Sequence, residues 1–295
     1  MRVNPYPIPD LLAALNQTQL ETLQATTEIS TGRSVNEPSD NPTAAALLVE
    51  NNDQATFNSG YLQSLDAVQG QLSTADSTLS SVVTAVQRAI SLGIEGGNGT
   101  LSDGDRAAIA TELQGIQSEL VSLANTSYQG RFVFAGTNTS APPFVVDNSV
   151  PSGVSYVGNT GVNQVSIGSG YKLAVNVPGS QLFSAVGNDV FLSINNLIQA
   201  LQTNTGIDTA VGAVGTASRY ISAQRVFYGN AGNQAQSQTT YLNTAKLQIS
   251  QQQNTLGGAD LAQAATELTQ AGIDTQATLA AISKLSQNNL FDYLK

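Results

Sequence analysis

Apolar residues recur at alternating steps of four and three along much of the chain, which is the spacing of one face of a helix. The most regular series runs from Tyr61 to Ala89. A seven-residue repeat sustained over about four heptads predicts a long helix that supercoils against partner helices. We expect this helix to run from Pro42 to about Leu92. Four members of the series are predicted core residues: Leu65, Leu72, Leu79 and Val86.

The same spacing continues in two further segments. One runs from Ile109 to about Tyr128, and the other runs from Val214 to Leu256. The short segment "GGNGTLSDGDR" separates the first of them from the preceding helix, so these two neighbours are expected to be antiparallel. Four more core residues are predicted in the two segments: Leu113, Leu120, Leu242 and Ile249.

Both ends of the chain carry a weaker form of the repeat. Residues 10–30 and 260–290 are rich in Thr, Gln and Ala and poor in large apolar side chains. Small residues bury little area, at about 25 cal/mol per Å², so these terminal helices should be marginal alone and become ordered on assembly. The apolar residues predicted for that assembly interface are Leu11, Leu15, Ile29, Leu268, Leu279, Ile282, Leu290 and Phe291.

The segment "STGRSVNEPSDNPTAAAL" ends one helix and begins the next. Gly32 suits a helix C-terminus, while Asn41 and Pro42 suit a helix start. Similar start signals are Ser102, followed three residues later by Asp105, and Asp260. The charged residues of the connector allow two interpretations, contact with adjacent subunits or a capped connector alone: Arg33, Glu37 and Asp40.

The residue composition changes at Arg131 and stays different to about Ser184. Val, Gly, Tyr and Asn replace Ala, Leu and Gln there, and apolar residues alternate with period two from Tyr171 to Val177. This pattern predicts a small β-rich insertion, with hairpin turns at "GNTG" (158–161) and "GSG" (168–170). A short helix from Phe191 to Leu201 should lead back to the long helices.

The predicted fold class is therefore mainly α with a β-rich insertion. The N- and C-terminal regions form a long antiparallel coiled-coil rod, and the insertion forms a small outer β domain. The expected organisation is an N-terminal assembly segment at 1–42, a helical rod domain at 43–130 and 186–258, the outer insertion at 131–185, and a C-terminal assembly helix at 259–295.

Composition excludes several function classes. The formal net charge is -10 and no basic patch is present, which argues against nucleic acid. Cysteine and histidine are absent, and the remaining residues form no recognisable catalytic constellation, so we expect no enzyme and no cofactor. Asp103 and Asp105 lack the further oxygen ligands of a calcium loop, so no metal site is expected. No run of about 18 apolar residues occurs, so no membrane insertion is expected.

Two long motifs resemble the flagellin superfamily. They are "STGRSVNEPSDNPTAA" and "GNGTLSDGDRAAIATELQGIQSEL". Two shorter motifs share the resemblance: "RFVFAGT" and, near the C-terminus, "LFDYL". The likeness covers about residues 1–140 and 215–295. Within the superfamily, "PSDNP" before the long helix resembles the hook–filament junction members, where filament flagellins usually carry an Asp-Asp-Ala-Ala type of sequence. Filament flagellin stays open as the alternative.

The resemblance implies a secreted structural adaptor of the extracellular bacterial flagellum. By the same resemblance, copies of the chain form a ring that joins hook-associated protein 1 to flagellin. It also implies secretion through the flagellar export apparatus, with a dedicated export chaperone holding the C-terminal helix beforehand.

Overall fold

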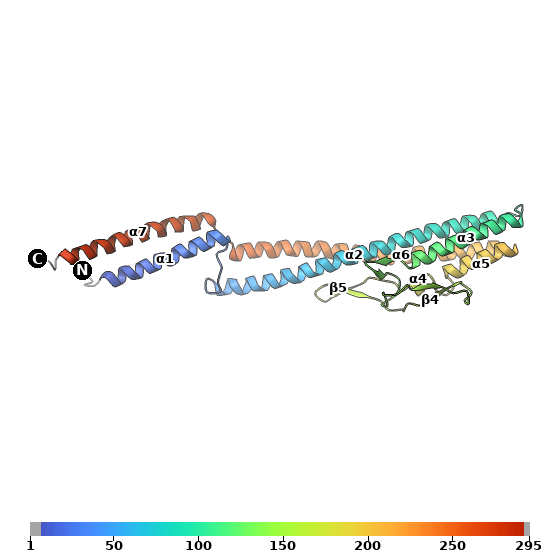
Figure 1. Ribbon diagram of the computed structural model, residues 1–295, viewed down its shortest axis with the longest axis horizontal. Helices are drawn as coiled ribbons and strands as arrows, with labels where there is room; N and C mark the ends of the chain where they lie inside the picture. Colours follow the sequence, from blue (N-terminus) through green and yellow to red (C-terminus); the bar gives the residue numbers. More distant parts are fainter. Residues whose placement is uncertain (1–6, 292–295) are drawn as a thin grey trace. The chain divides into compact units, whose positions relative to one another are not determined.

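The computed structural model describes residues 7–291, and the side chains of residues 8–285 within them. Seven helices and six short strands follow one another along this part of the chain (Figure 1). The helices are α1 (Pro7–Thr31), α2 (Pro42–Gly96), α3 (Asp103–Ala124), α4 (Gly179–Leu182), α5 (Val190–Thr203), α6 (Ile207–Gly257) and α7 (Leu261–Phe291). The strands are β1 (Ser127–Tyr128), β2 (Arg131–Phe132), β3 (Phe144–Val146), β4 (Val154–Tyr156), β5 (Gln164–Gly168) and β6 (Tyr171–Ala174). The predicted fold class, mainly α with a small β region, is confirmed.

The chain divides into two compact units. Unit 1 combines residues up to 57 with residues from 244 onward, and unit 2 consists of residues 58–243. The long helices α2 and α6 each contribute to both units, because the division falls within them.

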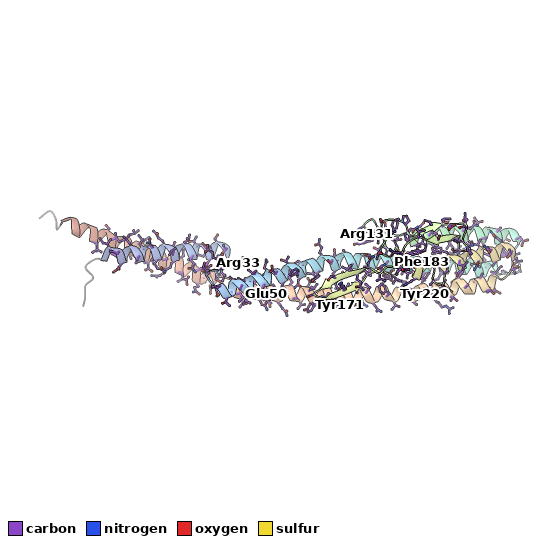
Figure 2. All side chains as sticks on the ribbon, turned by 90° about the horizontal axis from the view of Figure 1, so that it is seen from below. Arg33, Glu50, Arg131, Tyr171, Phe183 and Tyr220 are labelled. Atoms are coloured by element: carbon purple, nitrogen blue, oxygen red, sulfur yellow. The ribbon has the colours of Figure 1, made fainter. Side chains whose placement is uncertain are left out.

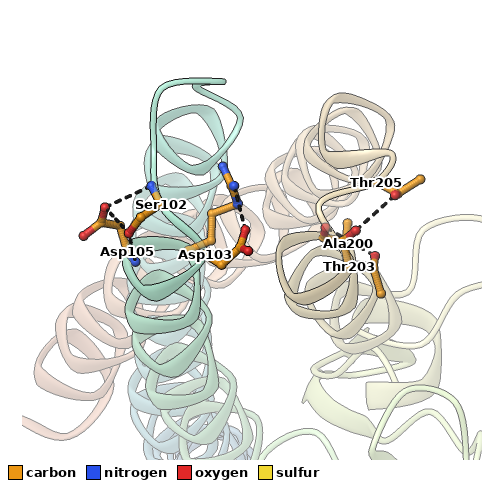
Figure 3. Close-up of polar contacts among 7 residues, drawn as sticks. Ser102, Asp103, Asp105, Ala200, Thr203 and Thr205 are labelled. Carbon is orange, nitrogen blue, oxygen red and sulfur yellow. Dashed lines mark hydrogen bonds and ion pairs between the residues drawn. The ribbon is translucent and has the colours of Figure 1, made fainter.

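The helix boundaries arise from local capping interactions. Gly32 follows α1 with a φ of 68°, a left-handed conformation that glycine adopts without steric cost. Asn41 accepts a 3.0 Å hydrogen bond from the backbone N–H of Ala44 in the first turn of α2. At α3, Ser102 and Asp105 form the predicted capping box (Figure 3). Helix α2 ends at Gly96, at the first residue of the predicted break "GGNGTLSDGDR" and one turn beyond Leu92.

The core of unit 2 lies between the long helices. Leu65, Leu79 and Leu113 are fully buried, and the predicted core residues of α2, α3 and α6 in this unit all have under 4% of their surface exposed. The eighth predicted core residue, Ile249, is buried in unit 1. The seven-residue repeat thus marks the buried stripe of each long helix, because that stripe must face a neighbour at every turn.

Three separate antiparallel hairpins make up the β region: β1 with β2, β3 with β4, and β5 with β6. "GSG" at 168–170 forms the turn between β5 and β6, where Gly170 has a φ of 72°. The prediction of a hairpin turn at "GNTG" is wrong. Residues 158–161 connect β4 to β5, which pair with different partners, and the Asn159 side chain holds this link by accepting the backbone N–H groups of Thr137 and Gly161. The hydrogen bonds of Asn159 therefore fix the conformation of this link, and the spacing of the glycines does not reveal them.

The β region packs into the same core as the helices of unit 2. Phe144 of β3 contacts Phe183, which follows α4, and Phe191 of α5, with ring centroids 5.4 Å apart in both cases (Phe183 is labelled in Figure 2). On α6, the buried Tyr228 hydroxyl accepts a 3.2 Å hydrogen bond from the Val177 N–H, just after β6. Burial also raises the pKa of that hydroxyl. Helix α3 ends at Ala124 rather than near Tyr128 because the chain there enters the first hairpin.

Candidate assembly surface of the terminal helices

Helices α1 and α7 lie side by side and antiparallel in unit 1 (Figure 1). Small residues occupy the contact between them, because Ala25, Ala264 and Ala271 are almost fully buried. At its centre the hydroxyl of Thr275 donates to that of Thr18 over 3.2 Å. A contact made of methyl groups and hydroxyls buries little apolar area per turn, so the pair gains little stability from it.

One stripe of α7 faces α1. It follows steps of four and three through Ala264, Leu268, Ala271, Thr275, Thr278, Ile282 and Leu285, all of which are buried or half-buried. Leu279, predicted as an assembly residue, lies outside this stripe with half of its surface exposed, and so does Leu261. Alanine occupies the most buried positions of this stripe, because small side chains let the two helices approach closely.

The assembly residues predicted from the sequence are therefore divided between two surfaces. Leu11, Leu15, Leu268 and Ile282 are half-buried beside the contact between the two helices. Ile29 and Leu279 are exposed. Leu290 and Phe291 lie outside the residues whose side chains the structure describes.

A second apolar surface, which we call the outer face, remains uncovered on the terminal helices. Ile8, Leu12 and Leu23 fall on one side of α1, and Leu23 has 64% of its surface exposed. The remaining members of the outer face are Leu20 of α1 and Leu261, Ile273 and Leu279 of α7. The sequence analysis missed the α1 part of it because these residues fall off the seven-residue repeat. The spacing of Ile8, Leu12 and Leu23, at four and eleven residues, also places them on one side of a helix and could have revealed them.

The groove between the two helices is acidic. It has a volume of about 320 Å³ and is lined by Glu21, Gln24 and Ala25 of α1 and by Glu267, Gln270 and Ala271 of α7. Four glutamine side chains donate to a carboxylate one turn later on the same helix: Gln17 to Glu21, Gln24 to Glu28, Gln263 to Glu267 and Gln270 to Asp274. No basic residue occurs in α1, so the carboxylates of this helix have no cationic neighbour on it.

The connector between α1 and α2 is tied to the break between α6 and α7. Arg33 pairs with Gly258 in an isolated antiparallel bridge, and the Ser34 N–H donates to the Gly257 carbonyl over 2.9 Å. Gly257 packs closely there, since an added Cβ would lie 2.9 Å from a terminal methyl of Leu48, which would have to shift. The two interruptions of the helical pattern therefore meet in space and are joined by backbone hydrogen bonds.

Within the connector, the three charged residues have different surroundings. The Asp40 carboxylate accepts the backbone N–H groups of Asn36 and Glu37 at 2.9 and 2.8 Å, and these hydrogen bonds lower the pKa of Asp40. The side chains of Arg33 and Glu37 are exposed (Arg33 is labelled in Figure 2). All three residues are exposed, but only the Asp40 carboxylate binds backbone N–H groups of the connector.

The described residues offer little that would bind a metal or cross a membrane. No group of three or more acidic residues is arranged to hold a metal ion in residues 7–291. In the same stretch, no helix combines the length and the apolar content of a membrane span.

Two family models match the chain. The bacterial flagellin N-terminal helical region matches residues 9–139, and the bacterial flagellin C-terminal helical region matches residues 211–294. Between them they include nearly all of α1 and α7. The chain belongs to the flagellin superfamily. The resemblance predicted from the motifs is confirmed, and its limits lie close to the predicted ones.

Curated relatives point to one branch of this superfamily. Flagellar hook-associated protein 3 of Salmonella typhimurium is 33% identical over 206 residues, and that of Escherichia coli is 29% identical over the same length. In both cases the match covers 70% of this chain and 63% of the relative. The chain therefore spans slightly less than two thirds of these relatives. A flagellin from Listeria monocytogenes is 22% identical over 272 residues, which is 90% of this chain and 88% of that protein.

Solved structures show the same fold. The flagellar junction protein FlgL from Legionella pneumophila superimposes with a TM-score of 0.62 at 14% identity, covering 72% of this chain and all of that one. FlgL from Bacillus cereus gives a TM-score of 0.51 at 20% identity, covering 73% of this chain and 99% of that one.

Proposed function

We propose that the chain is a structural, non-enzymatic component of the bacterial flagellum that acts as an adaptor at the hook–filament junction. In this role, copies of the chain form a ring that links hook-associated protein 1 to flagellin. The observation that carries the proposal is the uncovered outer face on α1 and α7, within the regions matched by the flagellin models. In this proposal, neighbouring subunits supply the helices that cover the exposed large apolar residues of both terminal helices.

The choice of junction adaptor over filament subunit is supported by the relatives. Identity is 33% and 29% to the two hook-associated proteins and 22% to the Listeria flagellin. Flagellin remains the second candidate, because the match to the Listeria protein extends over 88% of its length, against 63% for the hook-associated proteins.

The proposal extends to the route by which the chain reaches its site. It is secreted through the flagellar export apparatus, and an export chaperone covers the C-terminal helix before secretion. The outer face of α7, with Leu261, Ile273 and Leu279 exposed, is a surface that would aggregate if left uncovered in the cell. We also propose that residues 1–42 and 259–295 are the assembly segments, and that residues 43–130 with 186–258 and residues 131–185 form the rod and the outer domain.

Deletion in the source organism tests the role. We expect cells without the chain to keep intact hooks, lack filaments and release unpolymerised flagellin into the medium. Absent or shortened filaments with no released flagellin would contradict the junction role and favour the filament subunit. Antibody staining of hooks and immunoblotting of the medium for flagellin separate the two outcomes, and a plasmid copy of the gene provides the control.

A further inference from the structure

A second groove, in unit 2, lies between α2 and the β region. It has a volume of about 380 Å³, and α2 contributes Ser64, Ala67 and Gln71 to its lining. The opposite wall comes from the β1–β2 hairpin and from residues 163–165 at the start of β5. Amide, hydroxyl and aromatic groups line it together, which is the mixture found in sites that recognise a polar group.

The hairpin wall of this groove turns through Gln129 and Gly130, which both have a positive φ. Gln129 has a φ of 49°, which is uncommon for a residue with a side chain, and its amide donates to the Tyr128 hydroxyl over 3.3 Å. Tyr128 in turn lies against Gly70 of α2, where any Cβ would collide with its hydroxyl. Gly130 suits this two-residue turn with its φ of 76°, and the contact of Tyr128 with Gly70 holds the hairpin against α2.

Arg131 is the cationic member of this groove. Its Nε donates to the Thr139 hydroxyl over 3.1 Å, which orients the guanidinium. Among the described residues, the ion pairs involve Arg88, Arg106 and Arg225, and no carboxylate lies within 4.0 Å of Arg131. A guanidinium carries five N–H donors and matches a carboxylate with two parallel bonds. Arg131 is exposed at the surface of unit 2, where it is labelled in Figure 2.

We propose that this groove receives a carboxylate side chain from a second copy of the chain, with Arg131 as its partner. The inference rests on the proposed function, in which copies form a ring. Each copy carries a formal net charge of -10, and a cation at the contact between two copies reduces their mutual repulsion. A groove on one surface that binds a carboxylate on another surface makes a heterologous contact, and such contacts generate rings or helical assemblies.

Zero-length cross-linking tests the contact directly. Arg131→Lys keeps the positive charge and introduces an amine that a carbodiimide can couple to an adjacent carboxylate. In flagella isolated from cells that express this variant, we expect a covalent product of twice the chain mass. Mass spectrometry should place the new link between position 131 and an Asp or Glu of a second copy. The wild type and Arg219→Lys are the controls, because Arg219 is exposed and its hydrogen bonds stay within its own helix.

Charge reversal supplies the second measurement. We expect Arg131→Glu to release filaments at a lower shear force, with the thermal unfolding of the purified chain unchanged, whereas Arg131→Lys should keep wild-type attachment. Wild-type attachment of the Arg131→Glu variant would overturn the inference, and so would a link from position 131 to flagellin or to no second chain. These results are independent of the deletion phenotype, which tests the junction role alone.

Discussion

At the scale of single residues, most of the informative side chains cap a helix or close a loop. Asp40 accepts two backbone N–H groups of its own connector, and Asp105 accepts the N–H and hydroxyl of Ser102 in front of α3. Hydrogen bonds to the ionised form lower the pKa of both carboxyls. These residues act at short range, so a pattern of four or five letters is enough to reveal them.

The Asp40 carboxylate predicts a pH-dependent connector. The pKa of Asp40 in the folded chain lies below its ordinary value of 3.8. The stabilisation of the connector by the ionised carboxylate is therefore complete above pH 3.8 and is lost as the pH falls through the lowered pKa. We expect Asp40→Ala to accelerate amide hydrogen exchange at Asn36 and Glu37 near neutral pH, as measured by mass spectrometry or NMR. Ser39→Ala is the control, because its hydroxyl contacts only the Glu37 side chain. Equal protection in wild type and Asp40→Ala would contradict the capping role.

Loss of the Ser102 hydroxyl should measurably destabilise unit 2. Removing the hydroxyl of an N-terminal cap costs about 1 kcal/mol, because one backbone N–H of the first turn loses its partner. We expect Ser102→Ala to lower the free energy of unfolding by that amount in urea denaturation followed by circular dichroism. Ser118→Ala is a matched control, since Ser118 is exposed within the same helix and bonds only to the carbonyl four residues earlier. Similar losses in both variants would argue against the capping box.

At the scale of helices, a leucine of the seven-residue repeat can pack inside its own subunit or against a neighbouring subunit, and the repeat alone does not distinguish these cases. Leu72 of α2 has 2% of its surface exposed, whereas Leu279 of α7 has 50% exposed. The first side chain stabilises its own subunit. The second remains available for a neighbour, because the alanine and threonine stripe of α7 takes the place facing α1.

Aspartate substitutions should separate these two purposes. Leu72→Asp places a charge in the core of unit 2, which costs several kcal/mol, and we expect the purified variant to lose its cooperative unfolding transition. Leu279→Asp should keep the wild-type circular dichroism spectrum and unfolding midpoint. In cells, it should fail to restore filaments to the deletion strain. A Leu279→Asp chain that assembles like the wild type would count against the proposed role of the terminal helices.

At the scale of the whole molecule, the two units differ in what holds them together. Unit 2 contains the aromatic cluster of Phe144, Phe183 and Phe191 among layers of leucine. The α1–α7 contact of unit 1 relies on residues such as Thr18 and Ala271. Burial of apolar area is the main favourable term in folding, so the terminal pair should be the less stable part of a free chain.

This difference predicts the behaviour of the free chain. At low concentration, we expect amide hydrogen exchange to be fast throughout α1 and α7 and slow in the buried turns of α2 and α3. In assembled flagella the same terminal amides should become protected, because neighbouring subunits cover the outer face. Strong protection of both ends in the isolated chain would contradict assembly-coupled ordering.

Much of the fold could be predicted from the sequence because its signals are local. Gly32, Asn41, Pro42 and Ser102 mark helix ends through their own backbone preferences and short-range hydrogen bonds. The seven-residue repeat indicated the buried stripe of the long helices, since the period of a helix converts spacing along the chain into position on a face. The flagellin resemblance came from motifs at these same boundaries.

The sequence by itself determined where α2 and α3 begin and which residues of the long helices are buried, but it did not place the end of α3. Only the tertiary structure decided which face of α7 meets α1, which strands pair around residues 158–161, and which side chains surround Arg131. The reason is physical. Caps and periodicity depend on residues a few positions apart, whereas a choice between two acceptable faces or partners depends on how closely distant segments can pack.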